Sequence, residues 1–163
     1  GTTPLLAASR AGHSEVVREL LLSGAAVNLA NTDGETPLLI ASFHGYTAVV
    51  CELLGGGKVD VDQADVNGTT PLLAASRAGH SEVVRELLLS GAAVNLADTD
   101  GETPLCAASE GGHSKVVQEL LGASASVDQA DVNGTTPLLA ASRAGHSEVV
   151  RELLLSGAAV NLA

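Results

Sequence analysis

The chain consists almost entirely of one repeated unit. The segment GTTPLLAASRAGHSEVVRELLLSGAAVNLA occurs three times without change, at 1–30, 68–97 and 134–163. Two related units lie between these copies, so five units cover the chain, with bounds 1–33, 34–67, 68–100, 101–133 and 134–163. A period of this length is typical of solenoids, in which each unit buries its apolar face against its neighbours. We therefore predict a single elongated domain.

Each unit has the sequence signals of two helices. In the first unit Thr3 is a good N-cap, and Pro4 stands at the first helical position, where proline is favoured. Gly12 can take the left-handed conformation that ends this helix. Ser14 is expected to cap a second helix, whose apolar stripe is formed by Val16, Val17, Leu20 and Leu21. The remaining residues predict an extended loop that leads into a turn at 31–34.

Composition limits the classes of partner. The chain has 8 basic and 19 acidic side chains and a formal net charge of −11, which argues against a nucleic-acid or anionic-membrane partner. No apolar run approaches the roughly 18 residues of a membrane span. Two cysteines do not make a disulfide framework, so we expect a soluble protein of a reducing compartment, the cytoplasm. A single Phe and a single Tyr favour a core made of thin layers of Leu, Val and Ala.

Three short motifs recur in phase. Thr-Pro-Leu occurs once in every unit, Gly-His occurs four times, and Val-Val-x-Glu-Leu-Leu occurs five times. With this period, the chain resembles ankyrin-repeat proteins over its full length. The resemblance implies an all-α solenoid of stacked helix-turn-helix units with extended β-turn loops. The chain departs from the family signature where a histidine is expected, because that position holds Leu6, Leu39, Leu73, Cys106 and Leu139. In the family this histidine ties neighbouring units by hydrogen bonds, so its loss places more weight on apolar packing.

The near-identity of the units bears on the origin of the chain. Thirty unchanged residues in three copies indicate either a recent duplication of a two-repeat block or an engineered recombination of natural repeats. The first residue is Gly1 rather than methionine, and the chain stops abruptly at Ala163. We favour an engineered or excised chain, with recent duplication as the alternative.

The polar groups occur in copies, which argues against catalysis, because an active site usually requires one asymmetric constellation. Four of the five histidines directly follow a turn glycine: His13, His80, His113 and His146. Equivalent side chains of stacked units are expected about 10 Å apart, which is too far for shared zinc ligands. We predict that each histidine caps or braces the turn of its own unit. The chain is not expected to be an enzyme or to hold a metal or cofactor.

Other residues with chemical potential have structural interpretations. Cys51 and Cys106 are predicted to be buried free thiols, since two layers of the stack separate them and rule out a disulfide. The run Gly55-Gly56-Gly57-Lys58 lacks the spacing of a phosphate-binding loop and the Ser or Thr that should follow it, so we predict a loop that absorbs one extra residue. The serines that repeat in register have no acid–histidine partners peculiar to one place: Ser9, Ser42, Ser76, Ser109 and Ser142.

The resemblance implies a binding surface on the concave side, made by the loop tips and the exposed face of the first helix. The candidate partner-binding residues differ between units at these positions: Arg10, Asp33, Glu35, Phe43, His44, Val66, Asn67, Arg77, Asp100, Glu102, Glu110, Val132, Asn133 and Arg143. The alternative is that these positions vary because nothing constrains them. Acidic loop tips predict a negative rim that would steer a basic segment of a partner, and they include Asp33, Asp65, Asp98, Asp100 and Asp131.

Within that surface, Phe43 has the chemistry of an interface hot spot, because it is an outward-pointing aromatic flanked by Arg10 and Arg77. The alternative for Phe43 is that it covers the alanine surface of a neighbouring unit. We predict that the chain is a non-catalytic scaffold that binds another protein on its concave surface.

A second function of a different class is self-association. Natural arrays need terminal repeats with polar outer faces, whereas this chain starts and stops on the same internal type of unit. Copies could stack head to tail through Leu-rich end faces, or two could pair by a two-fold end contact. Terminal units that fray and hide their apolar surface would instead leave a monomer.

Overall fold

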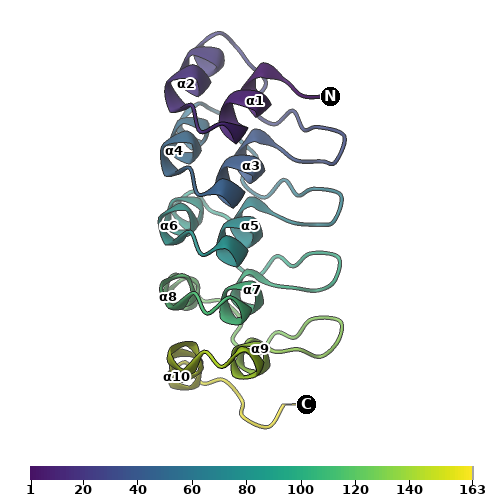
Figure 1. Ribbon diagram of the computed structural model, residues 1–163, viewed down its shortest axis with the longest axis vertical. Helices are drawn as coiled ribbons and strands as arrows, with labels where there is room; N and C mark the ends of the chain where they lie inside the picture. Colours follow the sequence, from purple (N-terminus) through teal and green to yellow (C-terminus); the bar gives the residue numbers. More distant parts are fainter. Residues whose placement is uncertain (163) are drawn as a thin grey trace.

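The structure is a computed structural model that describes residues 1–162, and within them the chain forms ten helices in five pairs (Figure 1). In chain order the helices are α1 (Pro4–Arg10), α2 (Ser14–Leu22), α3 (Pro37–His44), α4 (Thr47–Gly55), α5 (Pro71–Ala78), α6 (Ser81–Leu89), α7 (Pro104–Glu110), α8 (Ser114–Gly122), α9 (Pro137–Ala144) and α10 (Ser147–Leu155). No strand occurs among residues 1–162. The predicted all-α solenoid class is therefore confirmed.

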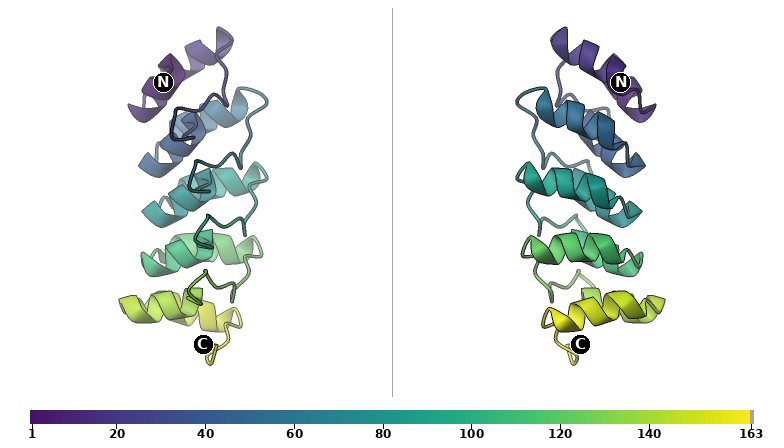
Figure 2. Two further views of the ribbon diagram at one scale, coloured as in Figure 1. Left: turned by 90° about the vertical axis from the view of Figure 1, so that its right-hand side faces the viewer. Right: turned by 90° about the vertical axis from the view of Figure 1, so that its left-hand side faces the viewer.

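The helices form two columns. The first helix of each pair stacks on the first helix of the next pair, and the second helices stack beside them (Figure 1). Loops project to one side before each new first helix; we call them fingers, and they comprise residues 31–35, 65–69, 98–102 and 131–135. Seen from the side of the second helices, the stack presents a ladder of roughly parallel helices (Figure 2). Fingers and second helices thus lie on opposite sides of the molecule.

The first helices begin as the sequence predicts. The Thr3 hydroxyl accepts the backbone N–H of Leu6 at 3.1 Å, and Pro4 follows at the first helical position. The same cap recurs at Thr36, Thr70, Thr103 and Thr136. The second helices begin differently, because Ser14 is the first helical residue and His13 is the N-cap, with no side-chain cap bond. The prediction that Ser14 caps the second helix is therefore wrong.

The core runs between the two columns without interruption. The first helices contribute a buried leucine in every repeat: Leu5, Leu38, Leu72, Leu105 and Leu138. These leucines form one cluster with buried residues of the second helices, such as Val84 and Leu87. Burying each such side chain contributes roughly 2 kcal/mol, so the stack is stabilised by many similar layers. No helix in the described part of the chain has both the length and the apolar character needed to cross a membrane.

Candidate partner-binding surface

Each finger is held by the side chain of its first residue. The Oδ1 atom of Asp65 accepts the backbone N–H groups of Asn67 at 2.9 Å and Thr69 at 2.8 Å. The equivalent residues make the same pair of bonds, and they are Asn31, Asp98 and Asp131. Asp65, Asp98 and Asp131 therefore turn a carboxylate oxygen into their own fingers. Within the predicted negative rim, Asp33 and Asp100 are exposed at the tips, whereas Asp65, Asp98 and Asp131 are half-buried at the starts of their fingers.

Neighbouring fingers are joined through their backbones. The backbone N–H of Val66 donates to the carbonyl of Asp33 at 3.1 Å. The same bond links Thr99 to Asn67 at 3.0 Å and Val132 to Asp100 at 3.0 Å. The fingers approach closely here, because a Cβ atom on Gly34 would lie 2.9 Å from the Cα of Asp65. The predicted tip residues therefore use their backbones to join the fingers, and their side chains remain available at the surface.

Arginines of the first helices form ion pairs across alternate junctions. The Nη2 atom of Arg10 lies 3.1 Å from Oε2 of Glu35 in the next repeat. Arg77 pairs in the same way with Glu102, and its Nη2 also lies 3.2 Å from Oδ2 of Asp98. The two other junctions have threonine where Glu35 and Glu102 stand, so they do not have this pair. Four of the predicted binding residues are thus already engaged with one another.

A hollow of about 370 Å³ lies around Phe43 on the finger side of the stack. Phe43 is 53 % exposed, and its ring meets His44 edge to face with ring centroids 5.2 Å apart. Tyr46 in turn stacks on His44 at 5.5 Å. The hollow is also lined by Arg10 and Arg77, so the structure brings together the three residues that sequence reasoning grouped.

A second hollow, of about 330 Å³, lies two repeats further along the same surface. Its lining includes three predicted binding residues, Glu102, Glu110 and Arg143. Cys106 also lines it, and burial raises the pKa of the Cys106 thiol to about 12. Glu110 occupies the position of Phe43, so the two hollows differ in chemistry, one centred on an aromatic ring and the other on carboxylates.

The histidines tie adjacent repeats together. Nε2 of His80 lies 3.1 Å from the backbone carbonyl oxygen of Phe43 in the preceding repeat. The equivalent pairs are His113 with Arg77 at 3.2 Å and His146 with Glu110 at 3.0 Å. Since a carbonyl only accepts, Nε2 carries the hydrogen. The prediction that the histidines brace the turns of their own units is wrong for His80, His113 and His146, because each of these three binds the end of the first helix one repeat earlier. These bonds supply ties of the kind that the missing signature histidine would make.

A further set of ties lies in the loops that follow the second helices. The Oδ1 atom of Asn95 accepts the backbone N–H of Ser126 in the next repeat at 2.8 Å. Equivalent bonds are made by Asn28, Asp62 and Asp128. Sequence reasoning missed these residues, although an Asn or Asp at this position in the first four units was the available signal.

The other candidate groups have structural roles. Cys106 is buried, but Cys51 is exposed, so the prediction that both thiols are buried is wrong for Cys51. Its side chain stands on the outer side of α4, at the position of Arg18 in α2. Four repeated serines are buried, namely Ser9, Ser42, Ser76 and Ser109. Within residues 1–162, no group of three or more His, Cys, Asp or Glu side chains is arranged to hold a metal ion.

Comparison with known proteins agrees with this geometry. A family model described as ankyrin repeats in three copies matches residues 5–98 and again residues 72–163. The chain therefore belongs to the ankyrin-repeat family. Ankyrin repeats are typically protein–protein interaction modules and are generally non-catalytic. A search of curated proteins found no match to this chain.

Proposed function

We propose that the chain is a scaffold that binds a protein partner on the concave surface formed by the fingers and first helices. The observation that carries this proposal is the exposure of Phe43 beside a hollow. Aromatic anchors that become buried in concave sites dominate binding energies, and Phe43 offers such an anchor. The ion pairs of Arg10 and Arg77 hold both flanking side chains in place, so the hollow is formed before the partner arrives.

The partner chemistry follows from the two hollows. An apolar side chain of the partner would contact Phe43, and a basic side chain would face Glu110 two repeats away. That separation is about 20 Å from the spacing of packed helices. The exposed carboxylates of Asp33 and Asp100 add the same preference for a basic segment.

The test is to remove the Phe43 anchor. Proteins captured from a lysate by the parent chain would be identified by mass spectrometry, purified and titrated against the Phe43→Ala variant. We expect the affinity to fall by about 2 kcal/mol, close to thirtyfold. Leu22→Ala is the control, because Leu22 is 77 % exposed on a second helix, away from the fingers. Equal binding of every partner by the parent and Phe43→Ala would remove Phe43 as the anchor.

Self-association through the end faces is the second candidate function. Val16 is 48 % exposed, whereas Val49, Val83, Val116 and Val149 at the same position are at most 1 % exposed. In a chain of residues 1–163 this face of the first repeat lacks the neighbour that covers its equivalents. Sedimentation across a dilution series would show masses that grow beyond a dimer with concentration, and Val16→Lys would abolish them. A strict monomer at high concentration would contradict this candidate.

A further inference from the structure

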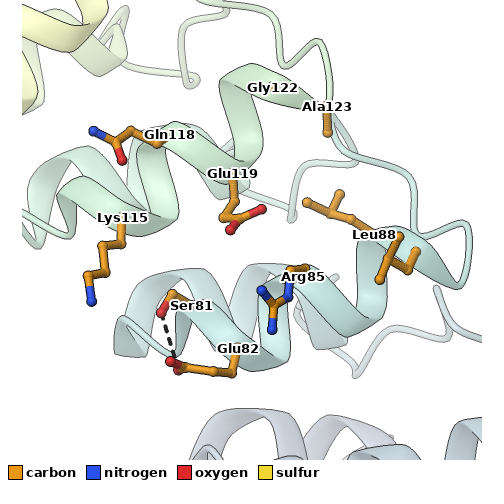
Figure 3. Close-up of a pocket in the computed structure, with 10 residues that line it drawn as sticks. Ser81, Glu82, Arg85, Leu88, Lys115, Gln118, Glu119, Gly122 and Ala123 are labelled. Atoms are coloured by element: carbon orange, nitrogen blue, oxygen red, sulfur yellow. Dashed lines mark hydrogen bonds between the residues drawn. The ribbon is translucent and has the colours of Figure 1, made fainter.

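A hollow on the outer face of the second helices lies on the side opposite the fingers. It measures about 840 Å³ and separates α6 from α8 on the outer face of the second helices (Figure 3). Neither the concave binding surface nor the end faces include it. Its residues therefore need a separate explanation.

The sequences of α6 and α8 differ in an informative way. The two helices have the sequences SEVVRELLL at 81–89 and SKVVQELLG at 114–122, which differ at three positions. At these positions Glu82 is equivalent to Lys115, Arg85 to Gln118 and Leu89 to Gly122. All six residues line the hollow. They are exposed, whereas the identical valines and first leucines are buried. The two helices are thus alike where they pack into the core and complementary where they face outward.

Leu89 and Gly122 have complementary shapes. Leu89 is 77 % exposed and projects at the end of α6. Gly122 leaves the equivalent place on α8 empty, since a Cβ atom there would meet nothing within 4 Å. A leucine from outside would gain contacts at Gly122 that Leu89 lacks in the single chain.

Glu82 and Lys115 have opposite charges at the other end of the hollow. Both are exposed, and neither forms an ion pair among residues 1–162. Arg18 in α2 bonds Glu52 of the next repeat at 2.6 Å, but Arg85 makes no such bond to Glu119, so the space between α6 and α8 remains open. The hollow is lined by both acidic and basic side chains. An occupant with charges of only one sign would therefore leave half of these side chains without an opposite charge. An occupant that carries the same pattern in reverse would place opposite charges against Glu82 and Lys115 and the Gln118 amide against Arg85.

We infer that two copies of the chain pair through this face about a two-fold axis that runs parallel to the helices, midway between α6 and α8. Such an axis places α6 of one copy against α8 of the other and keeps residues at the same height along the helices. Glu82 of one copy then faces Lys115 of the second copy. Leu89 of the first copy fills the space that the missing side chain of Gly122 leaves on the second copy. Each contact occurs twice, as an isologous interface requires. Four short helices make a small interface, so we expect a dissociation constant in the micromolar range.

The ionic half of the interface can be tested by exchanging its charges. Sedimentation velocity of the full chain with Val16→Lys, which blocks the end-face contact proposed above, is expected to show a concentration-dependent dimer and no larger species. Lys115→Glu and Glu82→Lys each place like charges opposite one another and should weaken the dimer about tenfold. The double variant restores opposite charges and should regain the parent affinity. A parent that stays monomeric at several hundred micromolar, or a double variant as weak as the single ones, would overturn the inference.

The apolar half can be tested with variants that keep the fold. Gly122→Leu inserts the residue found at this position in the first, third and fifth repeats, so it should leave thermal stability equal or higher and weaken the dimer at least tenfold. Leu89→Ala should also weaken the dimer. Leu22→Ala is the matched control, because Leu22 is equally exposed in an identical helix but has no counterpart across this axis. Equal losses for Leu89→Ala and Leu22→Ala, or no loss for Gly122→Leu, would exclude the proposed arrangement.

Discussion

Nε2 of His80 lies 3.1 Å from the carbonyl oxygen of Phe43 and donates its hydrogen to it, which joins the third repeat to the residue that centres the proposed binding site. The bond satisfies a carbonyl at the end of a first helix, where no further helical turn supplies a donor. The stacking of the repeats and the position of Phe43 are therefore linked. Loss of the histidine is expected to weaken both.

The contribution of the histidine bonds can be measured at a junction away from Phe43. His113→Ala removes the hydrogen bond to Arg77 and should lower the free energy of unfolding by about 1 kcal/mol, measured by urea denaturation. His13→Ala is the control, because His13 lies in the first repeat, where residues 1–162 offer no preceding carbonyl. If both variants lose the same stability, the junction bond is not what His113 supplies.

Two features of position 45 require glycine: the backbone conformation there and the closeness of the histidine of the next repeat. Its φ of +73° is left-handed, and a Cβ atom would lie 2.5 Å from Nδ1 of His80. Gly45→Ala should cost about 1 kcal/mol for backbone strain and about 1 kcal/mol more for the displaced hydrogen bond. Gly145→Ala isolates the first contribution, since Gly145 has a φ of +79° and nothing within 4 Å of an added Cβ. The midpoint of thermal unfolding should be lower for Gly45→Ala than for Gly145→Ala. The reverse order would contradict the histidine contact.

The two thiols should differ sharply in reactivity. Cys51 is exposed, whereas Cys106 is buried with a pKa of about 12, so its reactive thiolate is scarce at pH 8. Alkylation by iodoacetamide in the folded state should label Cys51 first, and Cys106 should react only after denaturation. Mass spectrometry of the Cys51→Ser variant isolates the slow site. Rapid labelling of that variant under native conditions would contradict the burial of Cys106.

Ionisation of the Asp131 carboxylate should make the free energy of unfolding depend on pH. The backbone N–H of Thr135, together with that of Asn133, lowers the pKa of Asp131. A lowered folded-state pKa stabilises the fold above the unfolded pKa of about 4, and this stabilisation is lost as the pH falls through the folded value. Asp131→Asn, which copies Asn31 of the first repeat, should have a lower urea midpoint than the parent at pH 7. The difference between the two midpoints should narrow as the pH falls below about 4, and an unchanged difference would show that the charge of Asp131 has no part in it.

The sequence by itself determined the helix pairs, the ankyrin-repeat class and the exposure of Phe43. The helix pairs depend on local signals. Thr3 caps the first helix by accepting the backbone N–H three residues later, Pro4 stands at the first helical position, and Gly12 ends the turn. Repetition then implied stacking, since one helix pair cannot bury its own apolar face. Local capping and periodicity are decided within a few residues, so they can be recognised without knowledge of the packing.

Only the tertiary structure decided which polar groups are engaged. Arg10 and Glu35 are 25 residues apart, and His80 and Phe43 are 37 apart, so their contacts exist only after the repeats stack in register. The same register leaves Cys51 exposed on the outer face and opens the hollow between α6 and α8. In a repeated sequence the units offer many of the same donors and acceptors. The geometry of each junction selects which of them meet, because hydrogen bonds and ion pairs form only within a few ångströms.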